Sequence, residues 1–127
     1  MIRWVFLLIT ALYAACSGPS PSMEKVLPST VSEWKLAGVT PISAADAPAL
    51  VRQLGLKQAV TATYQGPRTV KVRVYEMNVA TSAFELIQKW RQQDGPAVYS
   101  GQFFIVADAA PEIAAGLLDG LRRQLQK

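Results

Sequence analysis

One run of alternating residues, 59–77, constrains the fold of this 127-residue chain more than any other feature. Alternation with a period of two predicts a strand with one buried face and one solvent-exposed face. Residues 59–65 and 69–77 both alternate, and the Gly-Pro-Arg at 66–68 between them predicts a turn, so the two segments should form an antiparallel hairpin. In the second segment the expected core face carries Val70, Val72 and Val74, and the expected exposed face carries Lys71, Arg73 and Tyr75.

The flanking segments predict further elements of a mixed fold. A helix is expected over 47–54 with Asp46 as its N-cap, and another from a Ser82–Glu85 capping box to about residue 93. The second helix should lay its apolar stripe on the valine face of the hairpin. A further strand is expected at 31–39, residues 97–100 and 102–107 should form either a second hairpin or one bent strand, and a last helix should begin at Pro111.

This order excludes a parallel α/β fold, because a hairpin interrupts the alternation of strand and helix that such a fold requires. The sequence therefore predicts the α+β class. We expect an antiparallel sheet of four or five strands, with two or three helices packed on one face, in a single domain over residues 27–127.

The first fifteen residues have the layout of a secretory signal peptide. Arg3 precedes twelve uncharged, mostly apolar residues, 4–15. As a helix, twelve residues rise about 18 Å, against roughly 30 Å for the hydrocarbon core of a bilayer. We therefore expect residues 1–15 to be a cleaved signal rather than a permanent span.

The cysteine at position 16, the single cysteine of the chain, follows Ala14 and Ala15. The arrangement resembles a bacterial lipoprotein signal, in which a cysteine after small residues is lipidated and becomes the new N-terminus. Tyr13 departs from that pattern, which usually has leucine there. A Ser-, Pro- and Gly-rich tether over 16–26 suits a domain held off a membrane. The resemblance implies a lipid anchor on Cys16 in the bacterial cell envelope; the alternative is a soluble secreted or periplasmic protein cut by the general signal peptidase.

Composition excludes several classes of site. Histidine is absent, and a lone cysteine forms neither an intrachain disulfide nor a thiolate cluster, so we expect no metal and no other cofactor. The net charge of +4 is not gathered into a basic run, so we expect no nucleic-acid partner. Phosphate-binding glycine loops and a Gly-x-Ser-x-Gly nucleophile motif are also absent from the sequence. An enzyme is therefore the minority hypothesis, and its best candidate is a carboxylate-dependent hydrolase using Glu76.

Four residues are candidates for a binding site. Lys71, Arg73 and Tyr75 form a row on the expected exposed face that could hold an anion, and Trp90 could line a pocket. The alternative is structural: the row is an ordinary solvated sheet face, and Trp90 belongs to the helix stripe in the core.

Several fragments resemble a family of uncharacterised bacterial envelope proteins that contain a domain of unknown function. They are LGLKQA at 54–59, YQGP at 64–67, VRVYEM at 72–77, AFELIQKW at 83–90 and GQFFIV at 101–106. The resemblance implies an exported α+β domain and no catalytic residues. We expect a non-catalytic lipoprotein domain that serves as a protein-interaction or accessory module, with an envelope protein as its partner; the alternative is a domain that binds a small molecule or an anion.

Overall fold

The computed structural model of the chain describes residues 26–91 and 94–125. The predicted signal peptide, Cys16 and the predicted tether as far as residue 25 lie outside the described residues. Within the described ranges, no helix has both the length and the apolar character needed to cross a bilayer.

The centre of the fold is a six-stranded antiparallel sheet, which confirms the predicted α+β class. It has one or two strands more than expected, because residues 30–31 add a short edge strand and the segment around Gly101 folds into two strands. The spatial order is β1-β2-β3-β4-β6-β5. The strands are β1 (Thr30–Val31), β2 (Trp34–Ile42), β3 (Leu56–Gln65), β4 (Val70–Met77), β5 (Ala97–Ser100) and β6 (Phe103–Ala107).

The predicted hairpin is confirmed as β3 and β4, in a register that opposes Val60 to Val74 and Tyr64 to Val70. The predicted first strand, 31–39, is divided by a turn at Ser32 and Glu33, and its second part, β2, continues through Pro41 to Ile42. Proline is tolerated there because β1 pairs with β2 only at Trp34 and Lys35, so the part of β2 around Pro41 has β3 as its one neighbour among the described strands.

In the described part of the chain, three α-helices and a short 3-10 helix, η2 (Ala44–Asp46), accompany the sheet: α2 (Ala49–Gly55), α3 (Ala80–Lys89) and α4 (Pro111–Leu125). The predicted capping box is wrong, since α3 begins at Ala80 and Val79 occupies the N-cap without a side-chain hydrogen bond. The first helix also begins later than expected, because Asp46 belongs to η2 and Pro48 is the N-cap of α2.

The helices pack on both faces of the sheet, not on one. The valine face packs against α4, whose buried residues are Ala114, Leu117, Leu118 and Leu121. The opposite face packs against Val51 of α2 and against Ala83 and Leu86 of α3, so the apolar stripe of α3 does not lie on the valine face. The physical reason is that the second face of β4 changes character along the strand. It carries Lys71 and Arg73 first and then the buried side chains of Tyr75 and Met77, which give α2 and α3 an apolar surface.

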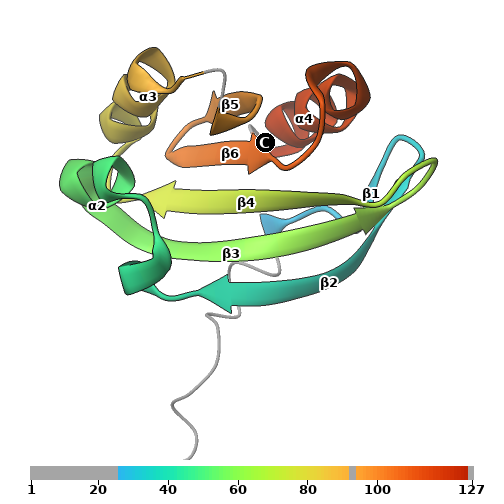
Figure 1. Ribbon diagram of the computed structural model, residues 1–127, viewed down its shortest axis with the longest axis horizontal. Coiled ribbons are helices and arrows are strands. Elements are labelled where there is room, and N and C mark those ends of the chain that lie inside the picture. The colour runs from blue at the N-terminus through green and yellow to red at the C-terminus, as the bar shows by residue number, and fades with distance from the viewer. Residues whose placement is uncertain (1–25, 92–93, 126–127) are drawn as a thin grey trace, which may run out of the picture.

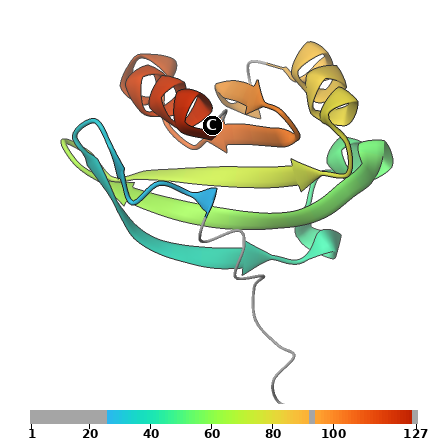
Figure 2. The same ribbon diagram turned by 180° about the vertical axis from the view of Figure 1, so that it is seen from behind.

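The arrangement in space follows from these two cores. In both ribbon views α3 and α4 lie on either side of the short β5–β6 pair, and β2, β3 and β4 run as long curved strands beside it (Figures 1 and 2). The sheet curls so that Val31 of β1 and Trp34 of β2 join the core of α4. Hydrogen bonds hold this curl, from the Tyr64 hydroxyl to the carbonyl of Pro28 (2.8 Å) and from the Trp34 ring to the carbonyl of Arg68 (3.2 Å).

Candidate ligand-binding site

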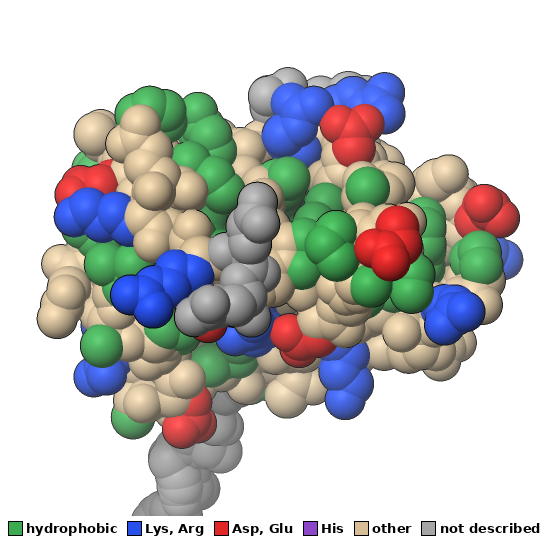
Figure 3. Space-filling model, turned by 45° about the horizontal axis from the view of Figure 1, so that its top comes forward, with side chains coloured by type: hydrophobic (Ala, Val, Ile, Leu, Met, Phe, Trp, Pro, Cys, Tyr) green, Lys and Arg blue, Asp and Glu red, His purple; other side chains and the backbone are tan. Residues whose placement is uncertain are grey.

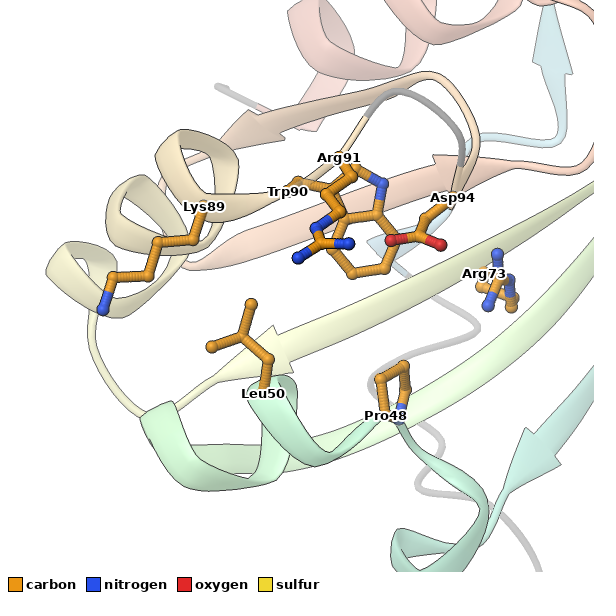
Figure 4. A pocket seen from close by; sticks show the side chains of 7 residues that line it. All are labelled: Pro48, Leu50, Arg73, Lys89, Trp90, Arg91 and Asp94. Atoms are coloured by element: carbon orange, nitrogen blue, oxygen red, sulfur yellow. The ribbon is translucent and has the colours of Figure 1, made fainter.

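A cavity of about 330 Å³ lies where α2, β4 and the segment after α3 meet. Figure 4 shows the Trp90 indole in the middle of this pocket, with Leu50 and Pro48 on the side of α2 and Arg73 on the side of β4. We call it the Arg73 pocket. Its lining residues are Pro48, Leu50, Arg73, Lys89, Trp90, Arg91 and Asp94.

The position of Arg73 follows from the register of the sheet. It lies between Thr61 of β3 and Val106 of β6, on the face that carries α2 and α3 but beyond the part that those helices cover. Its side chain is 27% exposed, and its Nη2 donates to the Asp108 carboxylate at 3.2 Å. The Nε donor is buried and has no partner among the described residues. A half-buried cation with an unused donor is unfavourable for stability alone, so it marks a candidate site.

Aromatic side chains form the floor next to Arg73. The Tyr75 hydroxyl accepts a hydrogen bond from Nη1 of Arg73 at 3.4 Å, and the Tyr75 ring is stacked on Phe104 with centroids 6.3 Å apart. The Trp90 ring meets Phe104 edge to face at 5.0 Å. Burial raises the pKa of Tyr75, and the Arg73 cation offsets part of that rise, so the phenol stays neutral near pH 7. These contacts hold one side of the guanidinium in place.

The charged side chains at the mouth of the pocket differ in their position and their partners. Lys89 extends away from the indole in Figure 4 and pairs with Glu85 one helical turn earlier at 3.1 Å. Arg91 and Asp94 flank the indole in the same view. Three cationic side chains and one carboxylate line the pocket, and two of these cations, Arg73 and Lys89, are paired with Asp108 and Glu85 just outside it. An anionic ligand would therefore be held by the directed donors of Arg73 rather than by an excess of positive charge.

The structure brings three of the four predicted site residues together. Arg73 and Trp90 line the pocket, and Tyr75 supports Arg73 from beneath. The expectation that Tyr75 faces solvent is wrong, because it is 1% exposed: its ring is packed among the residues under α2 and α3. Lys71 is exposed and does not line the pocket.

Sequence reasoning missed the rest of the lining. Arg91 gives a local signal, a cation directly after an aromatic residue at the end of a helix pattern. Pro48 and Leu50 give none, because they reach the site through the fold of α2 against α3.

Glu76, the candidate of the hydrolase hypothesis, lies outside this pocket on the valine side of β4. Its side chain is 12% exposed and lies 3.7 Å from Nζ of Lys57. One carboxylate oxygen accepts from the Gln58 amide at 2.6 Å and the other from the Gln102 amide at 2.9 Å. These partners occupy both oxygens, which is the pattern of a structural carboxylate. The described ranges bring no three Cys, Asp or Glu side chains into a metal-binding group.

No family model, curated protein or solved structure matches this chain. The resemblance to envelope proteins therefore stays a prediction. On the face shown in Figure 3, Lys and Arg side chains are interspersed with Asp and Glu.

Proposed function

We propose that the protein is a non-catalytic accessory domain of the bacterial cell envelope that binds a small anionic ligand in the Arg73 pocket. The observation that carries the proposal is Arg73 itself. It is held by Tyr75 and Asp108 at the edge of a cavity of about 330 Å³, with one buried donor unused. A guanidinium is suited to this task because its planar fork of donors matches carboxylate and phosphate oxygens.

The geometry supports binding better than catalysis. The carboxylate that lines the pocket, Asp94, is exposed, and the described lining includes no second carboxylate that could act with it as an acid-base pair. The aromatic floor offers flat apolar surface beside the cation, which suits a ligand that has a charged group and an apolar part.

The proposed location rests on the sequence. A lipid on Cys16 followed by a flexible tether would hold the domain near a membrane, where it could sample ligands of the envelope. The described residues that line the pocket fall within 48–94, far along the chain from Cys16.

The test is a titration of the full chain with inorganic phosphate, followed by tryptophan fluorescence and by calorimetry. We expect saturable binding that weakens as ionic strength rises, because the contacts are charged and partly exposed. Sodium chloride at matched ionic strength is the control. A phosphate titration that shows no more change than the chloride control contradicts the proposal.

A second candidate function, binding of a protein partner, is favoured by the outer edge of β2. Beyond Leu36, whose N–H donates to the carbonyl of Ser29 at 2.8 Å, no strand of the described residues pairs with this edge. Residues 37–42 are uncharged, and an uncharged edge can pair with an extended segment of an envelope protein. A photocrosslinker on a cysteine at Thr40 should then give an adduct of defined mass that the same label at Ala45 does not. Equal labelling from both positions would count against this surface.

A further inference from the structure

A second hollow borders the Arg73 pocket. It has a volume of about 430 Å³, and the described residues that line it are all uncharged: Ile87, Trp90, Gly95, Pro96, Ala97 and Pro111. We call it the Pro96 hollow. Trp90 lines both cavities, so a cationic cavity and an uncharged one lie on either side of a shared residue.

Trp90 is fixed in its position. Its ring N–H donates to the carbonyl of Gly95 at 3.1 Å, and its ring meets that of Phe104 in an edge-to-face contact. Gly95 lets the chain pass this close, because it has a φ of +109° and a Cβ there would lie 3.0 Å from the carbonyl oxygen of Ala107. With the polar atom of the indole satisfied, the ring offers only apolar surface to a ligand.

We propose that the ligand is an alkyl phosphate or alkyl carboxylate, with its anionic head at Arg73 and its short apolar tail across Trp90 in the Pro96 hollow. The inference rests on the proposed function, since the Arg73 pocket must bind the head. Charge complementarity decides the orientation: three cations line the Arg73 pocket, and none of the described residues that line the Pro96 hollow is charged. The tail gains affinity by leaving water for this apolar lining.

The experiment compares inorganic phosphate with hexyl phosphate on the full chain in phosphatidylcholine nanodiscs, with empty nanodiscs as the blank. Burial of one methylene strengthens binding about fourfold, so two buried methylenes give roughly fifteenfold. We therefore expect hexyl phosphate to bind at least about tenfold more tightly than phosphate. Equal affinities would overturn the inference and leave the proposed function standing. Failure of both ligands to bind would overturn both.

A matched pair of variants locates the tail. Ala97→Gln fills the Pro96 hollow without changing the charge, whereas Ala115→Gln makes the same change at an exposed position of α4. We expect the preference for hexyl phosphate to disappear in Ala97→Gln and to persist in Ala115→Gln, with phosphate affinity unchanged in both. Retained phosphate binding also shows that Ala97→Gln is folded. A tenfold preference that survives in Ala97→Gln contradicts the assignment of the hollow.

Nanodiscs that also contain phosphatidic acid distinguish the source of such a ligand. If the proposed head group comes from a membrane lipid, phosphatidic acid in the disc competes with hexyl phosphate. If it comes from a free metabolite, hexyl phosphate binds equally in both discs. Either outcome supports the shared head-and-tail chemistry.

Discussion

The backbone of Gly120 in α4 lies against the side chain of Val31 in β1, so closely that a Cβ on Gly120 would overlap the Cγ1 methyl of Val31. This contact holds the short edge strand onto the helix and closes the curl of the sheet around the valine-face core. Gly116, one turn earlier, has more room: a Cβ there would lie 3.7 Å from the Trp34 ring.

The two glycines should therefore respond differently to alanine. Gly120→Ala forces β1 away from α4, and we expect it to lower the free energy of unfolding by about 1–3 kcal/mol. Gly116→Ala should be neutral or stabilising, because alanine favours a helix over glycine by about 0.5–1 kcal/mol. Urea denaturation measures both. Equal effects of the two substitutions would show that the Val31 contact is not tight.

Tyr64 predicts a loss of stability at alkaline pH. Burial raises its pKa above the value of 10.0 that the group has in an unfolded chain. The contribution of Tyr64 to the free energy of unfolding is therefore intact below pH 10. It is lost as the pH rises further, because the phenol then ionises in the unfolded chain but not in the folded one. The free energy of unfolding should be flat from pH 7 to 9 and then fall.

The variant that tests the role of Tyr64 is Tyr64→Phe, which loses the 2.8 Å hydrogen bond to the carbonyl of Pro28. We expect it to be about 1 kcal/mol less stable than wild type at pH 7 and less sensitive to alkali. The double variant with Tyr75→Phe should be less sensitive still, because burial also raises the pKa of Tyr75. An alkaline loss that is unchanged in the double variant would assign the effect to other groups.

Replacing Glu76 with glutamine keeps the shape of the side chain but should lower the stability of the fold. In Glu76→Gln an amide NH₂ faces a donor amide from Gln58 or Gln102, and the charge on the acceptor is lost. We expect a loss of about 1–2 kcal/mol of stability. Glu112→Gln, in the exposed first turn of α4, is the control and should cost less than about 1 kcal/mol. Thermal denaturation distinguishes them, and a neutral Glu76→Gln would mean that the two amides do not hold the carboxylate.

The predicted lipid anchor gives a test in cells. Cys16→Ala should release the protein from the membrane fraction, because no thiol remains to carry the lipid. Ser17→Ala changes the neighbouring residue and should leave the protein with the membranes. Fractionation with mass determination of the N-terminal peptide measures both, and a Cys16→Ala chain that stays membrane-bound contradicts the anchor.

The hairpin was predictable because its alternation is almost unbroken and is flanked by a clear turn. The division of the helices between two faces could not be predicted. Tyr75 alternates with Lys71 and Arg73 and so resembles part of a polar face, although its ring is large enough to extend a core. Similarly, a two-residue strand such as β1 is too short to show any period, and it forms only through contacts with β2 and α4.

The candidate site was predictable in its parts but not in its assembly. Two residues could be found from local sequence patterns: Arg73 as a cation in a strand, and Trp90 as an aromatic residue at the end of a helix. They share a pocket because α3 crosses the same face of the sheet that Arg73 occupies, and no local pattern encodes that crossing. Arg91 becomes part of the site for the same reason.

The most direct test of the central claim, that Arg73 binds an anion, is the phosphate affinity of Arg73→Gln beside that of Lys71→Gln. Both variants remove one positive charge from the same face of β4, but only Arg73 lines the pocket. The account predicts that Arg73→Gln weakens phosphate binding by at least about tenfold, the loss expected for a charge-assisted contact. Lys71→Gln should bind within about twofold of wild type, because its charge is solvent-exposed and screened. Equal weakening in the two variants, or none in either, would contradict the claim.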